Sequence, residues 1–469
     1  MTPPRIAIIG GGITGLATTW ELRKRLPDAV LHLYEAAPRF GGKITTRTLE
    51  GCIVEGGPDS LLTEKPWGID LCRELGLGGD LLPSNDAQRS FSILHKGRLH
   101  PFPAGCKLFI PQKVTPILTT RLLSLPGKVR MLAEPLLPHQ MPEGDESLAN
   151  FTRRHFGQQA LERLAGPLLG GIYGGDPEDM SMAATFPRLR DLERKHRSLV
   201  KGMAHMMRQA RNQAKTSTPP GLFTTLRHGM QQLPDALVAR LTPHLRPDHP
   251  VQHLEKTGDT WRVDGESYDR VILALPARAS AKLLHPLAPA LAADLQQQST
   301  SSSATLSLVF ERNTVNPLPT GFGFMAAHPL ESLLVGCTWT GNKFSGRESD
   351  DTFVCRAFLG GPQGHTPILE HSEADLVQAA LDALRRICPF LPPTPRAHWL
   401  QRWPRGNPGY ALGHLDWVAN LHRQSAELGH LHLVGSSFEG ISVSDCIKQA
   451  RDLAESIAPG PKKNPPDSP

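Results

Sequence analysis

Apolar residues at the start of the chain follow the pattern of a strand, a helix and a second strand. Arg5–Ile9 is a short β-prone run, and the glycine cluster Gly10–Gly12 separates it from helical spacing over Ile13–Leu26. A Pro-Asp pair then ends the helix, and Val30–Tyr34 has the character of a second strand. The start of the chain therefore predicts a β-α-β unit.

The rest of the chain also mixes helical and strand patterns, and no internal repeat is visible. Helical spacing recurs over residues 61–75, 115–125, 148–164, 189–211, 279–284, 373–387 and 444–457. Strand-like runs cover residues 91–94, 98–102, 251–254, 261–263, 271–275, 304–310, 332–338, 353–359 and 431–434. Lys96-Gly97 predicts a hairpin turn, residues 215–221 a loop, and the Pro/Lys-rich residues 459–469 a disordered tail. These patterns predict an α/β protein.

The composition excludes several classes of protein. The 469 residues include 43 Gly and 43 Pro, which is typical of a loop-rich globular protein and not of a coiled coil, a collagen or a disordered scaffold. At roughly 150 residues per domain, this length predicts two to four domains. The net charge of +6 is small, and there is no long Lys/Arg tract or zinc-finger spacing, so we expect no nucleic-acid partner.

Hydropathy and cysteine usage predict where the protein resides. No run of about 18 apolar residues occurs, so we expect no membrane-spanning helix, and the N-terminus lacks the pattern of a secretory signal. The seven cysteines are odd in number and none forms a C-x-x-C pair, which predicts free thiols in a reducing compartment. We therefore expect a cytoplasmic protein.

The glycines after the first strand match a dinucleotide-binding motif. Gly10, Gly12 and Gly15 have the spacing G-x-G-x-x-G between a predicted strand and a predicted helix. The first glycine permits a tight turn, the second lets the backbone approach a pyrophosphate, and the third lets the helix pack on the strand. The helix N-terminus offers N–H groups to phosphate, and Glu35 can accept hydrogen bonds from ribose hydroxyls. We therefore predict a bound dinucleotide.

Further glycine-rich segments favour FAD over NAD. Gly41-Gly42-Lys43 follows Glu35, residues 56–60 form another close-approach loop, and a strand–glycine turn–helix pattern recurs over residues 432–443. This arrangement resembles flavoproteins with two dinucleotide-binding motifs, in which the last helix N-terminus can face the flavin pyrimidine. The predicted cofactor-binding residues are Gly10, Gly11, Gly12, Ile13, Thr14, Gly15, Glu35, Ala36, Gly42, Lys43, Gly57, Pro58, Asp59, Ser60, Val251, Gly435, Ser436, Ile441, Ser442 and Val443.

These motifs together resemble the flavin-dependent protoporphyrinogen/coproporphyrinogen oxidase family, within the amine-oxidase-like flavoproteins. The resemblance covers nearly the whole chain, with narrower markers at residues 171–176, 184–187, 271–276, 321–324, 358–361 and 438–447. It implies a Rossmann-like FAD-binding domain over residues 1–88, 220–296 and 405–469. It also implies an α+β substrate domain over residues 89–101 and 297–404, and a helical, membrane-associating domain over residues 102–219.

The resemblance further implies tetrapyrrole-binding roles for five residues. Arg89 matches an arginine that pairs with a substrate propionate, which suits the planar fork of a guanidinium. Gly171 matches a glycine whose backbone borders the tetrapyrrole, and Phe358 matches an aromatic residue that sandwiches one pyrrole ring. Met325 and Thr338 stand where the family usually has leucines, and the Thr338 hydroxyl departs from an apolar wall.

The implied reaction is the oxygen-using oxidation of protoporphyrinogen IX to protoporphyrin IX, with release of hydrogen peroxide, in heme biosynthesis. The flavin carries such chemistry, and the sequence contains no hydrolase triad and no metal-binding box, so we name no catalytic side chain and no metal. Coproporphyrinogen III oxidation is the nearest alternative, and would need more cations than Arg89, such as Lys65, Lys96 or Arg98. An amine or carotenoid oxidase, or a non-catalytic flavin or porphyrin carrier, is a more distant alternative.

Residues 103–145 combine apolar helical faces with interspersed basic residues. This pattern is typical of an amphipathic region that packs on a protein core, whereas the resemblance implies a monotopic contact with a membrane. The sequence leaves both interpretations open, as it does a homodimer. The expected partners are thus a tetrapyrrole and molecular oxygen, with a peripheral contact on the inner face of the cell membrane.

Overall fold

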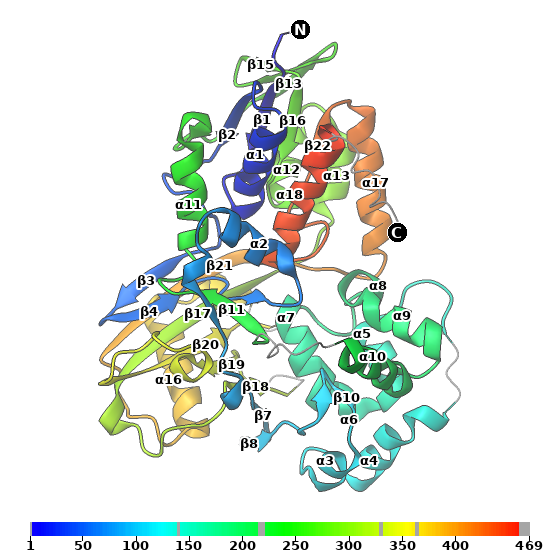
Figure 1. The fold of residues 1–469 in the computed structure, drawn as a ribbon, viewed down its shortest axis with the longest axis vertical. Helices are drawn as coiled ribbons and strands as arrows, with labels where there is room; N and C mark the ends of the chain where they lie inside the picture. The colour runs from blue at the N-terminus through cyan, green and yellow to red at the C-terminus, as the bar shows by residue number, and fades with distance from the viewer. Residues whose placement is uncertain (1, 138–140, 214–220, 328–331, 362–364, 459–469) are drawn as a thin grey trace.

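The computed structural model describes residues 2–137, 141–213, 221–327, 332–361 and 365–458. These residues form three regions: a parallel sheet covered on both faces, a seven-stranded mixed sheet, and a set of helices (Figure 1). The parallel sheet stands at one end of the molecule, and the mixed sheet and the helices lie side by side at the other. The expected mixed α/β fold is confirmed.

The parallel sheet is assembled from distant parts of the chain. Its strands in spatial order are β12 (Leu245–Arg246), β2 (Val30–Tyr34), β1 (Arg5–Ile9), β16 (Arg270–Leu273) and β22 (Leu431–Leu433). The helices on one face are α1 (Ile13–Arg25), α2 (Pro66–Glu74), α11 (Gln232–Leu241) and α18 (Val443–Ile457). The other face carries β13 (Leu254–Thr257), β14 (Thr260–Val263), β15 (Glu266–Tyr268), α12 (Ala277–Leu284), α13 (Pro289–Gln296) and α17 (His414–Glu427). Because both faces are buried, β1 and β16 are apolar almost throughout.

The seven-stranded sheet has one face against helices and the other toward the parallel-sheet region. Its order is β21 (Ala397–Pro408), β17 (Thr300–Glu311), β20 (Thr352–Leu359), β19 (Leu334–Trp339), β18 (Gly323–Ala326), β7 (Ser92–His95) and β8 (Arg98–Pro101). Only the β18–β7 pair is parallel among these described strands. Leu306, Leu308 and Phe310 of β17 pack with α15 (His365–Glu370) and α16 (Glu373–Ile387). The intervening side chains of β17 therefore point to the opposite face.

Small sheets of two or three short strands lie between these regions. They are β3 (Thr46–Leu49) with β4 (Cys52–Glu55), β11 (Phe223–Leu226) between β5 (Leu61–Leu62) and β6 (Leu81–Pro83), and β9 (Cys106–Lys107) with β10 (Ile110–Pro111). The β3–β4 hairpin packs on the face of the seven-stranded sheet formed by β21, β17 and β20, so the glycine-rich loop after β4 meets both larger sheets.

The helical region fills residues 114–213. Its members are α3 (Val114–Thr119), α4 (Leu125–Leu132), α5 (Leu148–Phe156), α6 (Gln158–Ala160), a π-helical segment (Leu161–Gly170), α7 (Gly171–Tyr173), α8 (Met182–Thr185), α9 (Pro187–His196) and α10 (Leu199–Gln213). None of the helices in the described part of the chain has the length and hydropathy needed to cross a bilayer.

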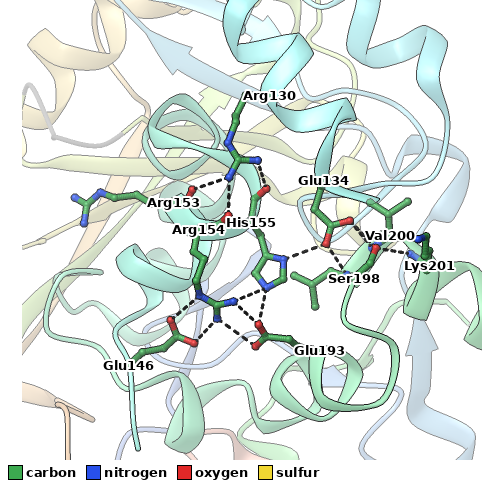
Figure 2. Close-up of polar contacts among 11 residues, drawn as sticks. Arg130, Glu134, Glu146, Arg153, Arg154, His155, Glu193, Ser198, Val200 and Lys201 are labelled. Atoms are coloured by element: carbon green, nitrogen blue, oxygen red, sulfur yellow. Dashed lines mark hydrogen bonds and ion pairs between the residues drawn. The ribbon is translucent and has the colours of Figure 1, made fainter. Parts of the chain in front are cut away.

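A buried charge network holds the helical region together. Figure 2 shows the His155 ring between two carboxylates, with Nδ1 3.0 Å from Glu134 Oε1 and Nε2 3.1 Å from Glu193 Oε1. Glu134 also accepts from the Leu199 backbone N–H at 2.7 Å, and Arg154 pairs with Glu193. The His155, Glu134 and Glu193 side chains are fully buried, so this network joins α5, α9 and the start of α10 without solvent between them.

Several predicted element boundaries were wrong. Residues 61–75 begin as strand β5, and the helix starts only at Pro66. The long helix predicted over 148–164 is interrupted at Gly157 with φ 86°, and the one over 189–211 at Arg197 with φ 54°. A residue with a positive φ ends a helix, as Gly157 and Arg197 do here. The hydrophobic periodicity continues across such a break, so it does not detect the end of the helix. The loop predicted at 215–221 and the tail at 459–469 lie almost wholly outside the described residues.

The domain ranges stay a prediction. Their arrangement agrees with a parallel sheet built from early, middle and late segments, but the boundary at residue 405 falls inside β21. β21 and α17 were not predicted at all, although β21 pairs with β17 along much of its length. The seven cysteines, all described, are free thiols as expected.

Candidate cofactor and substrate site

A cavity of about 810 Å³ opens where the three regions meet. The glycine turn after β1 and residues of α1 and α18 line one side of it, Thr305 of β17 and Phe358 of β20 line another, and Gly171 and Tyr173 of the helical region contribute a third. This volume lies within the range of roughly 300–1,000 Å³ that is usual for ligand sites. A ligand bound here contacts every part of the fold.

The glycine motif forms a close backbone cradle at the parallel-sheet end of the cavity. Gly10 has φ 112°, which favours glycine, and a Cβ on Gly15 would overlap the Gly10 carbonyl oxygen. A Cβ on Gly12 would meet nothing closer than the Gly42 Cα at 4.0 Å, so its face is open to the cavity. α1 begins at Ile13 without a side-chain cap, and its first N–H groups are available to a phosphate.

Glu35 is fixed at the end of β2. Its carboxylate accepts hydrogen bonds from the backbone N–H of Gly11 at 2.8 Å and of Ala37 at 2.9 Å. The N–H of His249 donates to the Glu35 carbonyl oxygen, and this places the segment before Val251 beside the same strand end. Glu35 lines the cavity, so an oriented carboxylate faces the ligand space, as ribose recognition requires.

The N-terminus of α18, a helix near the C-terminus of the sequence, also faces the cavity. Ser442 caps this helix and forms a capping box with Asp445, while Ile441, Ser442 and Val443 line the cavity. A helix N-terminus stabilises negative charge, which suits the edge of a flavin that becomes electron-rich on reduction. The two helix N-termini and the glycine cradle therefore fit a flavin dinucleotide.

Lys43 and Gly57 lie between these two ends. A Cβ on Gly57 would overlap the Lys43 carbonyl oxygen, so only glycine allows this contact between the two loops. Lys43 Nζ donates to the Gly406 carbonyl oxygen, and burial lowers the pKa of this lysine. Trp403 Nε1 donates to the Gly56 carbonyl oxygen at 2.7 Å, which joins β21 to the same loop.

The structure brings most of the predicted cofactor residues to the cavity. Those that line it are Gly10, Gly12, Ile13, Thr14, Glu35, Gly42, Lys43, Gly57, Pro58, Asp59, Ser60, Gly435, Ser436, Ile441, Ser442 and Val443. Gly11 donates to Glu35, Gly15 is buried against Gly10, Ala36 is exposed, and Val251 packs partly buried beside α12 and β13. Their assignment as cofactor-binding residues stays a prediction.

The predicted substrate residues divide into two groups. Gly171 and Phe358 line the cavity, whereas Arg89, Met325 and Thr338 do not. The Arg89 side chain is 56% exposed and lies 3.8 Å from the Asp86 carboxylate. Met325 packs against the helical core, and Thr338 borders a small separate pocket beside Arg356. Their assignment as substrate-binding residues stays a prediction.

Several cavity residues had not been singled out in the sequence. The most notable carry polar or aromatic groups: Tyr173, Thr305, Arg356, Trp403 and Asn407. Tyr173 is the aromatic residue within the marker at 171–176, so that motif could have indicated it. Arg356 stands two residues before Phe358, and strand alternation places both side chains on one face. Among the described residues, no group of His, Cys, Asp and Glu could hold a metal ion.

Comparisons with known proteins agree with this geometry. Residues 13–458 match the family described as flavin containing amine oxidoreductase. The coproporphyrinogen III oxidase of Bacillus subtilis (strain 168) is 33% identical over 457 residues, which cover 95% of this chain and 96% of that protein. The chloroplastic protoporphyrinogen oxidase 1 of Arabidopsis thaliana is 28% identical over 479 residues, which cover 95% of this chain and 86% of that protein.

Solved structures show the same fold. The structure named "putative protoporphyrinogen oxidase" from Exiguobacterium sp. 255-15 has a TM-score of 0.87 and 31% identity, over 98% of this chain and 99% of that one. Cyclohexylamine oxidase from Brevibacterium oxydans IH-35A has a TM-score of 0.69 at 16% identity, over 97% of this chain and 99% of that one, which indicates a shared fold. The predicted FAD cofactor agrees with the family match and with the cradle. The chain belongs to the flavin containing amine oxidoreductase family and is an FAD-dependent oxidoreductase.

Proposed function

We propose that the protein oxidises a porphyrinogen to the corresponding porphyrin with oxygen as the electron acceptor. The observation that carries this proposal is the continuity of the cavity from the dinucleotide cradle to Gly171 and Phe358. A flat tetrapyrrole needs an apolar slot next to the flavin, and a cavity wall that carries both a bare glycine backbone and an aromatic ring suits one. The names of the full-length relatives support the same substrate class.

The side chains of such an enzyme orient the substrate and exclude water. The chemistry supplied by bound FAD is acceptance of a hydride from a bridging carbon, followed by electron transfer to oxygen. Gly171 leaves room for the ring because a Cβ there would meet no atom within 4 Å. Phe358 offers an aromatic face from β20 against which a flat ring can be held next to the cofactor.

We infer that coproporphyrinogen III is the substrate, although protoporphyrinogen IX was the main prediction from the sequence. Relatives named for coproporphyrinogen III include two that are 33% and 32% identical over nearly the whole chain, against 28% for the plant protoporphyrinogen oxidase. The additional carboxylates of this substrate need cations. Lys65 is held by Asp445 at 2.6 Å, which makes it a weak candidate, whereas Arg356 lines the cavity.

The deciding experiment is anaerobic reduction of the flavin by each porphyrinogen. We expect both coproporphyrinogen III and protoporphyrinogen IX to bleach the flavin absorbance, with at least tenfold faster reduction by coproporphyrinogen III. Readmission of air should restore the yellow colour and release peroxide. If neither compound bleaches the flavin, the oxidase proposal fails, and if protoporphyrinogen IX is faster, the substrate assignment fails.

Gly171→Leu gives the matching test of the slot. The new side chain has room in the protein alone but would occupy the ligand space, so we expect porphyrinogen-dependent bleaching to slow by roughly tenfold or more with normal FAD content. Gly79→Leu is the control, because a Cβ at Gly79 also meets no atom within 4 Å and Gly79 does not line the cavity. Equal reduction rates in the two variants would contradict the placement of substrate against Gly171.

We also propose that α3 and α4 contact an anionic membrane surface. Large hydrophobic side chains are exposed here, and the most exposed are Leu125 at 72%, Val129 at 60% and Leu136 at 85%. In Figure 1, α3 and α4 form the tip of the helical region opposite the parallel sheet. Residues 102–133 contain five Lys or Arg and no Asp or Glu. An apolar patch in a segment whose charged residues are all basic suits the headgroup region of an anionic bilayer.

The double substitution Leu125→Glu/Val129→Glu is expected to abolish most binding to phosphatidylglycerol vesicles. It removes apolar area from the contact and adds two charges that an anionic surface repels. Vesicle co-sedimentation at low and high salt measures the effect. The control is Leu412→Glu/Leu415→Glu, which changes two other exposed leucines elsewhere, at 50% and 52% exposure. The proposal fails if both double variants bind vesicles alike.

A further inference from the structure

Five charged side chains form a cluster beside the cavity wall, here called the Asp59 cluster: Glu55, Asp59, Lys343, Arg347 and Arg356. Lys343 Nζ lies 2.8 Å from Asp59 Oδ2, and Arg356 Nη1 lies 3.9 Å from the same oxygen. Arg347 Nη1 lies 3.4 Å from Glu55 Oε1. These pairs join β4, the loop after it, the segment after β19 and β20.

The Asp59 cluster contains three cations and two carboxylates, and its two arginines and Glu55 are buried, whereas Lys343 and Asp59 are 12% and 23% exposed. The side-chain exposures are 2% for Arg347, 5% for Glu55 and 6% for Arg356. Burial raises the pKa of Glu55. Burial alone would also raise the pKa of Asp59, but Lys343 and Arg356 hold it well below its ordinary range. With three cations against two carboxylates, the cluster carries one unbalanced positive charge in a largely buried position, which is costly unless an anion is nearby.

Arg356 is the cation of this cluster that reaches the cavity. It lines the 810 Å³ space together with Asp59 and Phe358, whereas Lys343 and Arg347 border only the small pocket behind it. Its guanidinium donates to the Gly57 carbonyl oxygen at 2.5 Å and lies 4.9 Å from the centre of the Phe358 ring. Its Nε is buried with no hydrogen-bond partner among the described residues. Arg356 thus combines an unbalanced charge with spare donor capacity at the ligand wall.

We propose that Arg356 stabilises a delocalised negative charge on the ligand that occupies this part of the cavity. Two ligand groups have that chemistry: the flavin ring, which gains negative charge on accepting a hydride, and a carboxylate of the porphyrinogen. The pyrophosphate is a poorer match, because the N-terminus of α1 is available to it at the Gly12 cradle. If the negative charge belongs to a porphyrinogen carboxylate, the inference rests on the proposed function. If it belongs to the flavin, the inference depends only on the cofactor.

The test compares Arg356→Gln with Arg356→Lys in the holoenzyme. If the flavin is the anion, Arg356→Gln should shift the two-electron reduction equilibrium against reduction by at least about tenfold, which corresponds to about 30 mV. Sulfite, which forms an anionic flavin adduct, should bind more weakly in the same variant. Arg356→Lys should retain most of the wild-type midpoint potential because it keeps the charge.

A different measurement tests whether Arg356 pairs with a carboxylate of the substrate. In that case the midpoint potential of Arg356→Gln is unchanged, and its affinity for coproporphyrin III, measured by absorbance titration, falls by roughly tenfold or more. If coproporphyrin III fails to bind the wild-type holoenzyme, the proposed substrate fails, and the potential measurement still tests the flavin source.

A matched control and a second variant keep the proposal falsifiable. Arg402→Gln removes one positive charge from β21, which is separated from β20 by β17, on the opposite face of the sheet, where Arg402 donates to the Ile368 carbonyl oxygen. It should change neither readout. Asp59→Asn removes a negative charge from the cluster and should move the midpoint potential upward, even if Arg356→Gln proves unstable. The proposal is overturned if Arg356→Gln alters only FAD retention, or if the variants at positions 356 and 59 match Arg402→Gln in potential and in porphyrin affinity.

Discussion

Replacement of Gly12 by alanine is expected to produce a folded protein that retains FAD at least 10- to 100-fold more weakly than the wild type. The added methyl group has room in the protein itself, since the nearest atom would be Gly42 Cα at 4.0 Å. It projects into the cavity where the backbone must approach the pyrophosphate, and an overpacked contact of this kind costs roughly 1–3 kcal/mol. The measurement is FAD dissociation followed by flavin fluorescence.

Gly15→Ala is the comparison that separates cofactor binding from folding. A Cβ at Gly15 would overlap the Gly10 carbonyl oxygen, a backbone atom that cannot move aside easily. We expect Gly15→Ala to lower the thermal unfolding midpoint of the flavin-free protein, and Gly12→Ala to leave that midpoint unchanged. Tight FAD binding by Gly12→Ala would show that the pyrophosphate does not approach the backbone there.

The cofactor cradle could be predicted from the sequence because its determinants are local. The strand, the glycine spacing and the helix that follow one another in β1 and α1 all lie within the first 25 residues, and their bounds were predicted almost to the residue. The distant segment at residues 435–443 was also predicted, because it repeats the same strand–glycine–helix pattern. In both segments the glycine after the strand has a positive φ, 112° at Gly10 and 125° at Gly435, which favours glycine, so the reason is visible in the residue type.

The substrate side of the cavity could not be predicted in the same way, because its residues are brought together only by sheet pairing. Arg356 lies opposite Ser307 on β17 and Thr338 on β19, and no spacing rule connects these three positions. β21 was missed because its sequence includes Pro and Gly and lacks a clear alternation. Arg89 matched a family position in the sequence, yet it is largely exposed and pairs with Asp86 in the structure.

The His155 network shows a third kind of residue, whose role is invisible in the sequence. His155 follows Arg153 and Arg154 in the last turn of α5, and such a basic turn is usually exposed to solvent. Its side chain is instead fully buried between Glu134 and Glu193. Burial alone would lower the pKa of His155, but hydrogen bonds to both carboxylates and the charge of Glu193 raise it above its ordinary 6.5. Burial opposes ionisation of Glu193 as well, but the hydrogen bonds from His155 and Arg154 lower its pKa to about 2.

His155→Leu is therefore expected to destabilise the fold by about 3–5 kcal/mol, the usual cost of removing one partner from a buried ion pair. The loss should depend on pH. Because the folded-state pKa of His155 is raised, its protonation stabilises the fold fully below about pH 6.5, and this contribution is lost as the pH rises through the folded pKa. The carboxylate contribution has the opposite sign, since the lowered pKa of Glu193 stabilises the fold above its ordinary 4.5 and is lost on acidification toward pH 2.

The difference in thermal unfolding midpoint between wild type and His155→Leu should therefore be larger at pH 6 than at pH 9. Circular dichroism of the helices measures both midpoints. The control is His398→Leu, which replaces an exposed histidine at the second position of β21, and its effect on the midpoint should not depend on pH. A gap between wild type and His155→Leu that is equal at both pH values would mean that His155 is neutral in the folded protein. The two carboxylates would then need another source of compensation, and Arg154, which already contacts Glu193 and Glu146, is the cation placed to supply it.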